Sequence, residues 1–222
     1  MVVLKSEKWV HGGYTIAHAN DMVYFIKGAI PGEIVECEII QEKKDHNFAL
    51  VKTIIEKSNS RIENKCSSFP ICGGCSFLQI SYEDELKLKL NLLKTELENK
   101  NIIFPEIKIQ SGNPQNYRNN VQLKIKNGKI GFYKDKSDEI IPLPRNGCLI
   151  LSEELNKYIL NKNNKLTKDE KLRFSKKIDT YGSDISTFEI LGKEIKIPAN
   201  GFFQINRFLI AKWILEIKEL IT

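Results

Sequence analysis

Hydrophobic and polar positions alternate along most of the N-terminal quarter of the chain. The runs "GYTIAHA", "MVYFIKGA", "EIVECEIIQE" and "FALVKTIIEK" predict β-strands, because successive strand side chains point to opposite faces. Turn-forming residues separate these runs: Gly12 and Gly13, Asn20 and Asp21, Pro31 and Gly32, and Asp45, His46 and Asn47. Short strands about ten residues apart are typical of small barrels, since closure hides the sheet edges. We therefore predict a small antiparallel, OB-like β-barrel over residues 1–60.

A helical period replaces the alternation after residue 80. Residues 81–100 predict an α-helix that Ser81 caps and whose first turn carries three acidic side chains. Four leucines follow one face of this helix: Leu86, Leu90, Leu93 and Leu97. Their spacing predicts that they lie in a core or an interface.

Two hairpins are predicted in the second half of the chain. Asn127 and Gly128 separate two alternating runs within residues 121–133, which is a strong hairpin signal. The sequence "EIIPL" that follows predicts a third strand. A second hairpin is predicted over residues 186–198, with its turn at Gly192.

Two helices and one polar stretch are predicted around these hairpins. Ser152 is expected to cap a short helix over residues 152–160. The polar and basic residues 161–178 are expected to form an exposed loop with some helix. Residues 206–222 carry a broad apolar stripe at helical spacing, and we expect this helix to leave part of the stripe exposed.

Length and composition place the chain among ordinary globular proteins. Its 222 residues suit two compact domains, and hydrophobic residues make up 41% and charged residues 28% of the chain. No apolar stretch approaches the ~20 residues needed to cross a bilayer, and the N-terminus does not resemble a signal peptide. We therefore expect a cytoplasmic protein without membrane contact, in which thiols stay reduced. Nothing in the sequence predicts an obligate protein partner.

The net charge of +6 is spread along the chain and does not form one patch. Residues 1–65 carry nine basic and nine acidic side chains, and the excess of basic residues lies beyond them. This distribution permits contact with phosphate groups but does not require it.

The cysteines carry the clearest chemical signal. Cys66, Cys72 and Cys75 lie within ten positions, and Cys148 follows after 72 intervening residues, behind a predicted strand. Cys37 lies within an alternating strand and is expected to be a small buried hydrophobic residue. Clustered cysteines in a reducing compartment bind metal more often than they form disulfides.

The residues alone leave the nature of this cysteine site open. Four thiolates suit a tetrahedral structural zinc ion as well as an iron–sulfur cluster. A redox pair or unrelated buried thiols are further interpretations, although a redox pair would leave Cys66 unexplained. Gly73 and Gly74 favour a bulky inorganic group, because glycines let the backbone turn tightly and leave amide groups free to point at sulfur.

The chain resembles the bacterial RNA (uracil-carbon-5) methyltransferases that begin with a TRAM domain. "GGYTIAHANDMVYFIKGAIPGEIVECEI" is similar to the TRAM barrel of this family, and "CSSFPICGGCSFLQISYEDELKLK" to its cluster loop. "YRNNVQL", "GFYKDKSDEIIPLPRNGCLI" and "ANGFFQIN" follow in the order that the family has. Radical methylthiotransferases also join a TRAM domain to a cluster, but their cysteines follow C-x3-C-x2-C and this chain has C-x5-C-x2-C.

The resemblance implies a metal centre and its ligands. Four cysteines, Cys66, Cys72, Cys75 and Cys148, would ligate a [4Fe-4S] cluster. Because cysteine would occupy all four corners of the cluster, its role would be structural.

The resemblance also implies the reaction and some of the site residues. The family transfers a methyl group from S-adenosylmethionine to carbon 5 of a uridine in RNA, and among its substrates we favour 23S rRNA over tRNA. Gln204 would contact S-adenosylmethionine. Phe202 would lie against the target base, and Arg118 would touch RNA phosphate.

A multidomain α+β architecture follows from these predictions. Residues 1–60 would form the barrel, residues 61–198 a mixed α/β central domain with the cluster loop, and residues 199–222 the start of a methyltransferase domain. Most of this Rossmann-like domain, with its nucleophile and its cofactor loop, would be absent, so the chain alone is expected to be inactive. The alternative is a non-catalytic RNA-binding module with a structural metal site of four cysteines.

Overall fold

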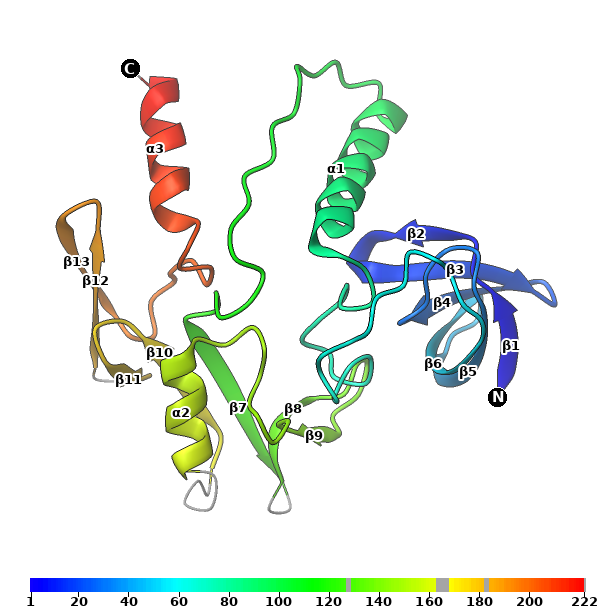
Figure 1. The fold of residues 1–222 in the computed structure, drawn as a ribbon, viewed down its shortest axis with the longest axis horizontal. Coiled ribbons are helices and arrows are strands. Elements are labelled where there is room, and N and C mark those ends of the chain that lie inside the picture. The colour runs from blue at the N-terminus through cyan, green and yellow to red at the C-terminus, as the bar shows by residue number, and fades with distance from the viewer. Residues whose placement is uncertain (127–128, 163–167, 182–183, 222) are drawn as a thin grey trace. The chain divides into compact units, whose positions relative to one another are not determined.

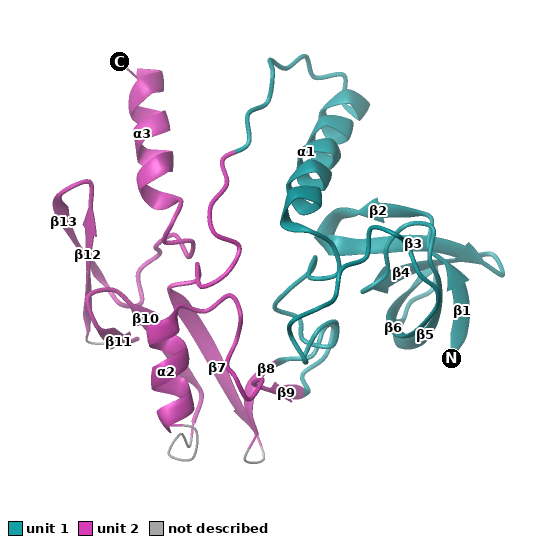
Figure 2. Cartoon of the chain, in the orientation of Figure 1, with its two compact units in different colours: residues 1–109, 133–139 teal, residues 110–132, 140–222 magenta. Residues whose placement is uncertain are grey.

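The computed structural model of the protein describes residues 1–126, 129–162, 168–181 and 184–221 (Figure 1). The chain divides into two compact units (Figure 2). Unit 1 consists of residues 1–109 and 133–139, and unit 2 consists of residues 110–132 and 140–222. The segment 133–139 of unit 1 therefore interrupts the sequence of unit 2.

A six-stranded sheet forms the N-terminal part of unit 1 (Figure 1). Its strands are β1 (Val2–Lys5), β2 (Lys8–Val10), β3 (Tyr14–Ala19), β4 (Met22–Lys27), β5 (Ile34–Glu42) and β6 (His46–Glu56), and a single 3-10 turn, η1 (His11–Gly13), joins β2 to β3. The order across the sheet is β1-β5-β6-β4-β3-β2. The predicted strands are confirmed.

Two features of this sheet differ from the predicted antiparallel barrel. Strands β4 and β6 pair in parallel, with Phe25 opposite Phe48, whereas the other pairs are antiparallel. The sheet also has β1 and β2 as its edges, and among the described residues no ladder closes it into a barrel. The parallel pair arises because β5 lies outside β6 and not between β4 and β6.

One face of the sheet builds the core of unit 1. Ile26, Val35, Ala49 and Cys37 are fully buried there. Burial raises the pKa of the Cys37 thiol to about 12, and the nearby Glu36 carboxylate acts in the same direction. The interpretation of Cys37 as a small buried hydrophobic residue is therefore confirmed.

Helix α1 (Tyr82–Asn99) follows the cysteine loop, and the structure confirms its predicted cap. The Ser81 hydroxyl accepts a hydrogen bond from the Asp84 amide at 3.0 Å and donates one to the Asp84 carboxylate at 2.7 Å. The leucine stripe was predicted to lie in a core or an interface; the core is contradicted within the described residues, and the interface stays a prediction. No residue of the helix is buried, and Leu93 is 46% exposed.

Because α1 has no buried side chain, its N-cap should contribute measurably to its stability. Ser81→Ala is expected to destabilise the helix by about 1 kcal/mol, since it removes an acceptor from the first turn. Ser81→Asp keeps an acceptor and serves as the control. Thermal unfolding followed by circular dichroism would show a lower melting temperature for the alanine variant than for the aspartate variant. Equal melting temperatures would contradict the role of the cap.

Unit 2 holds a five-stranded sheet and a separate hairpin (Figure 1). The sheet has the order β11-β10-β7-β8-β9, and its strands are β7 (Asn120–Lys126), β8 (Lys129–Tyr133), β9 (Ile140–Pro142), β10 (Glu170–Phe174) and β11 (Ile178–Thr180). The hairpin joins β12 (Ile185–Ile190) to β13 (Lys193–Pro198). Its predicted turn is confirmed, because Leu191 and Gly192 both adopt positive φ values of 51° and 73°.

The first predicted hairpin is confirmed in its strands. β7 and β8 pair antiparallel, and β9 is the predicted third strand. The predicted turn at Asn127 and Gly128 lies outside the described residues. Helix α2 (Glu153–Lys162) begins after Ser152, whose hydroxyl accepts a hydrogen bond from the Leu155 amide at 3.2 Å, so this cap is confirmed as well.

The predicted exposed loop over residues 161–178 is wrong for the part that the structure describes. Residues 163–167 lie outside it, but β10 is an interior strand of the sheet, between β11 and β7. Leu172 and Arg173 of this strand are fully buried. Because most residues around them are charged, the sequence pattern does not indicate a strand here.

Helix α3 (Ile210–Ile221) is the last element of unit 2. It confirms the predicted amphipathic helix, although it begins four residues later than residue 206. Trp213 is 52% and Leu220 is 84% exposed, so part of the apolar stripe lies at the surface as expected. Within the described ranges, no helix combines the length and the apolarity that a bilayer crossing requires.

Candidate functional sites: the cysteine loop and the Phe202 loop

The first candidate site is the cysteine loop of unit 1, between β6 and α1. Cys66, Cys72 and Cys75 are all half-buried in this loop. The side chain of Asn64 holds the first cysteine in place, because its Oδ1 accepts from the Cys66 amide at 2.9 Å and its Nδ2 donates to the Cys66 carbonyl at 2.6 Å. The Cys72 amide donates to the Ser68 carbonyl at 2.8 Å, which closes the turn between the two cysteines.

Residues 133–139 hold the other side of the cysteine loop. The Gly73 amide donates to the Tyr133 carbonyl, and the Asp135 amide donates to the Ile71 carbonyl, both at 3.0 Å. Cys72 and Lys134 form an antiparallel bridge between these contacts. The backbone of the loop is therefore fixed on both sides of Cys72.

A buried polar network lies next to Cys72. Asp135 accepts a hydrogen bond from the Tyr14 hydroxyl at 2.5 Å and lies 3.4 Å from the Lys27 ammonium group, which is 2% exposed. Burial raises the pKa of Tyr14 far above its usual value, and the Asp135 carboxylate adds to this effect, so the phenol remains a donor. Burial also raises the pKa of Cys72, while the Gly74 amide, which donates to its Sγ at 3.4 Å, opposes that shift.

Two glycines of the sheet allow the cysteine loop to pack closely. A Cβ atom on Gly13 would lie 2.4 Å from Cβ of Ser76, and one on Gly28 would lie 2.8 Å from Cβ of Pro70. Both glycines also adopt positive φ values, of 77° and 88°. A larger residue at either position would push the loop away from the sheet.

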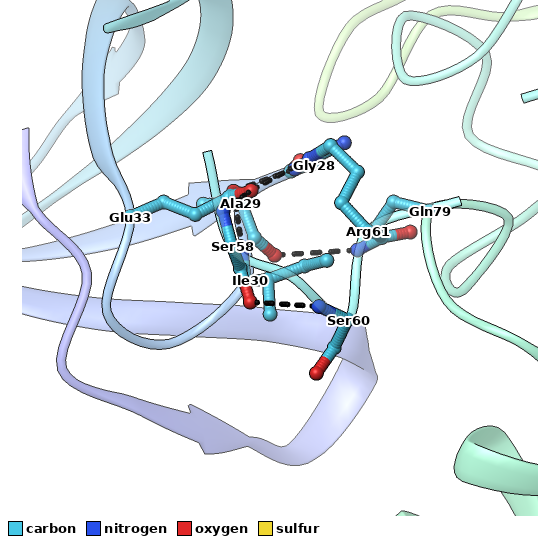
Figure 3. Close-up of polar contacts among 8 residues, drawn as sticks. All are labelled: Gly28, Ala29, Ile30, Glu33, Ser58, Ser60, Arg61 and Gln79. Carbon is cyan, nitrogen blue, oxygen red and sulfur yellow. Dashed lines mark hydrogen bonds and ion pairs between the residues drawn. The ribbon is translucent and has the colours of Figure 1, made fainter. Parts of the chain in front are cut away.

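A buried ion pair joins the sheet to the start of the loop (Figure 3). The fully buried Glu33 carboxylate accepts from Nε and Nη2 of Arg61 at 2.7 and 2.6 Å, and Arg61 also donates to the Gly28 carbonyl at 2.7 Å. The amides of Ile30 and Ser58 donate to the same carboxylate at 2.9 and 3.1 Å. Burial alone would raise the pKa of Glu33, but these donors outweigh it and the pKa lies below its usual value.

The donor set of the cysteine loop fits a thiolate-bound metal or cluster. Three cysteines share one anchored loop, and the Gly74 amide donates to the Cys72 sulfur, a contact that would also stabilise a ligated thiolate. Among the described residues, no three His, Cys, Asp or Glu side chains already converge on one point. The fourth predicted ligand, Cys148, belongs to unit 2.

The backbone of Cys148 is fixed within unit 2 by one asparagine. The Cys148 amide donates to Oδ1 of Asn156 at 2.8 Å, and Nδ2 of Asn156 donates to the Cys148 carbonyl at 2.9 Å. Gly147 has a φ of 84°, and a Cβ atom there would lie 2.6 Å from the same Oδ1 atom. The residue before the cysteine must therefore be small.

The second candidate site is the loop over residues 198–207 of unit 2, which we call the Phe202 loop. Phe202 is 85% exposed, and Gln204 is also exposed. The neighbouring ring of Phe203 stacks on Phe188, with the centroids 3.9 Å apart and an angle of 17° between the planes. Thus one phenylalanine anchors the loop and the other is presented to solvent.

The segment before β7 anchors the second half of this loop. Asn119 is buried; its amide donates to the Ile205 carbonyl at 2.9 Å, and its Nδ2 donates to the Gln204 carbonyl at 3.0 Å. The backbone of Arg118 bridges Asn206, and its Nε donates to the Asn120 carbonyl at 3.0 Å. The structure therefore brings the predicted residues 118, 202 and 204 into one region of unit 2.

Sequence reasoning missed two residues that hold the Phe202 loop. Asn119 stands within the quoted "YRNN" stretch, but only the arginine before it was predicted as a site residue. Arg173 donates to the Pro198 and Gly201 carbonyls from a strand that the sequence pattern predicts as a loop. The alternating apolar residues Leu172 and Phe174 were the local signal that could have indicated a buried strand here.

Comparison with known proteins shows which proteins the chain is similar to. No family model matches it. A protein of Leptospira interrogans serovar copenhageni, named an uncharacterized RNA methyltransferase, is 36% identical to it over 99% of this chain and 59% of that protein. The chain is homologous to RNA methyltransferases. It spans about three fifths of the length of this relative.

Other RNA methyltransferases match smaller parts of the chain. A Marinomonas protein named 23S rRNA (uracil(1939)-C(5))-methyltransferase is 34% identical over 68% of this chain and 34% of that protein. The fold is similar to that of a tRNA (uracil-54, C5)-methyltransferase of Pyrococcus abyssi in complex with S-adenosyl-L-homocysteine. The TM-score is 0.67 and the identity 17%, over 98% of this chain and 64% of that one. The relationship to RNA uracil-C5 methyltransferases is thus supported by sequence, and the fold agrees with it.

Proposed function

We propose that this chain is the RNA-binding and cluster-bearing part of an enzyme that methylates carbon 5 of a uridine in RNA, with 23S rRNA as the favoured substrate and S-adenosylmethionine as the methyl donor. The observation that carries the proposal is the homology to RNA methyltransferases over 99% of the chain. The name of the Marinomonas relative supports the choice of 23S rRNA.

The Phe202 loop would supply the contact with the uridine. An exposed aromatic ring on an anchored loop suits stacking against a base that has left its helix, because every base offers a π face. The ring of Phe202 is exposed and could stack on a base, whereas the ring of Phe203 already stacks on Phe188. Gln204, two positions further, would face the methyl donor, and Arg118 would touch RNA phosphate.

The cysteine loop would hold the metal centre. Cys66, Cys72, Cys75 and Cys148 would ligate a [4Fe-4S] cluster, which supplies no step of methyl transfer but fixes backbone segments that are distant in sequence. The hydrogen bonds of Asn64 to Cys66 and of Asn156 to Cys148 would prepare two of these ligands for the cluster.

RNA binding and its dependence on Phe202 test the proposal. A short fluorescent RNA with unpaired uridines is expected to bind the chain, with an affinity that falls as salt rises because phosphate contacts release counterions. Phe202→Ala should weaken binding by about five- to tenfold, the loss typical of one aromatic platform, without changing the salt dependence. Fluorescence anisotropy measures both quantities.

Trp213→Ala is the matched control for this test. Trp213 is an exposed aromatic residue of the same unit, but it lies on α3 and not in the Phe202 loop. Its substitution should leave RNA affinity unchanged. Equal losses for the two variants, or no loss for Phe202→Ala, would contradict the proposed base contact.

A further inference from the structure

Arg173 is a buried cation without an anionic partner. It is 1% exposed, and no carboxylate among the described residues lies within ion-pair distance of it, although the buried Asp179 is its register partner on β11. Its Nε atom is buried and has no hydrogen-bond partner in the described part of the chain. Burying a guanidinium group in this way costs free energy that an apolar residue of similar size would not cost. The residue therefore needs an explanation other than core stability.

The contacts of Arg173 are directed at the Phe202 loop. Nη2 donates to the Gly201 carbonyl at 2.7 Å, and Nη1 lies 3.4 Å from the Pro198 carbonyl. The Tyr181 hydroxyl accepts from Nη2 at 3.3 Å, and the Tyr181 ring lies 5.4 Å from the guanidinium carbon. The flat, forked guanidinium group can reach both carbonyls at once, which a lysine cannot do in the same geometry.

The Phe202 loop is thus held at two places. Arg173 holds residues 198 and 201, Asn119 holds residues 204 and 205, and Phe202 lies between these anchors with its ring in solvent. The Gly201 amide also donates to the Pro198 carbonyl at 2.8 Å, which closes a turn directly before Phe202. Arg173 therefore donates to the two carbonyl groups of a hydrogen-bonded turn. Rigid support of this kind places a contact residue within the narrow range that recognition needs.

We infer that Arg173 is a positioning residue that fixes the turn before Phe202, and so sets the direction in which this ring meets a base of the RNA. This inference rests on the proposed function, because it assumes that Phe202 contacts the substrate. It assigns Arg173 no contact with RNA. The forked guanidinium group accounts for a buried charge at this position, because it donates to both carbonyls of the turn.

Photo-crosslinking of a short 4-thiouridine RNA to the full chain tests the inference. In the unaltered chain, crosslinks should map to the peptide that contains Phe202. Arg173→Lys should reduce the yield at this peptide by about fivefold or more, the factor expected when a base loses its aromatic platform. Total RNA affinity should fall by no more than the five- to tenfold expected for Phe202→Ala. With protein in saturating excess, the crosslinks at other peptides should change by less than about twofold, because phosphate contacts elsewhere still hold the RNA.

Arg207→Lys is the matched control. Arg207 follows the anchored turn, but its guanidinium group lies 3.4 Å from the Glu154 carboxylate and over the Phe208 ring, and none of its hydrogen bonds or ion pairs in the described chain goes to residues 198–201. This variant should keep the crosslink at Phe202. If circular dichroism shows that Arg173→Lys does not fold, Arg173→Gln takes its place in the comparison. This variant removes the buried charge and keeps one NH2 group as a donor.

Each result separates the inference from the proposed function. A chain that binds no RNA, or that binds RNA without a crosslink at the Phe202 peptide, overturns the proposed base contact and the inference with it. Folded Arg173 variants that retain the crosslink overturn the inference alone. Loss of the crosslink in the Arg173 variant but not in Arg207→Lys supports it.

Discussion

Arg61→Met is expected to destabilise unit 1 by about 3–5 kcal/mol, because it leaves the Glu33 carboxylate buried without its cation. The carboxylate has no exposed surface, and the arginine side chain is 11% exposed. Methionine retains most of the apolar part of the side chain, so the substitution removes mainly the positive charge and its hydrogen bonds. The Gly28 carbonyl also loses its donor, which adds to the effect.

Urea unfolding measures this loss when the signal comes from unit 1 alone. The chain has two tryptophans, so a Trp213→Phe background leaves Trp9 as the reporter. Lys52→Met is the matched control, because it removes the cation of the exposed Lys52–Glu38 pair and should cost less than about 1 kcal/mol. If both substitutions shift the unfolding midpoint equally, the buried pair does not have the assigned role.

The same pair gives stability a predictable pH dependence. The pKa of Glu33 is lower in the folded chain than in the unfolded chain, so the pair contributes stability above the unfolded pKa. This contribution is lost as the pH falls through the folded pKa. The difference in unfolding free energy between the unaltered chain and Arg61→Met should therefore be largest near neutral pH and should decrease in acid.

The sequence predicted correctly those features that depend only on residues close together in the chain. The caps at Ser81 and Ser152 and the turn at Gly192 depend on neighbouring residues, and all three are present. The parallel pairing of β4 with β6 depends on where β5 lies in space, for which a single strand carries no signal. Strand β10 was missed because its two apolar positions, Leu172 and Phe174, stand within a long charged stretch, and the buried Arg173 between them is of a residue type expected at the surface.

The contrast between local and non-local causes also explains which residues of the candidate sites the sequence could indicate and which it could not. Cysteines at short spacing are visible in any sequence, and the exposed Phe202 belongs to a recognisable motif. Arg173 meets its two carbonyl partners 25 and 28 residues along the chain. Its partners are backbone atoms, which every residue has, so no residue type in the sequence indicates the contact.

Cys72→Ser is expected to remove the metal centre and to destabilise the chain at once. If the cysteine loop holds a [4Fe-4S] cluster, oxygen-protected protein should be brown and contain about four iron atoms and as many labile sulfides, and the variant should fall to background. The free energy of a centre bound only by the folded chain is also folding free energy, so its melting temperature should decrease together with the iron content. Elemental analysis, absorbance near 400 nm and thermal unfolding provide the three measurements.

Cys37→Ser separates metal loss from ordinary destabilisation. Cys37 is fully buried in the core of the sheet, so a serine there places a hydroxyl among apolar side chains and lowers stability by about 1–3 kcal/mol. Iron per folded chain should nevertheless stay unchanged in this variant, because Cys37 lies outside the cysteine loop. Loss of iron in Cys72→Ser alone would assign the metal to the loop. Colourless protein with stoichiometric zinc would instead support a structural zinc site of four cysteines, and Cys72→Ser protein with full iron content would remove Cys72 from the ligand set.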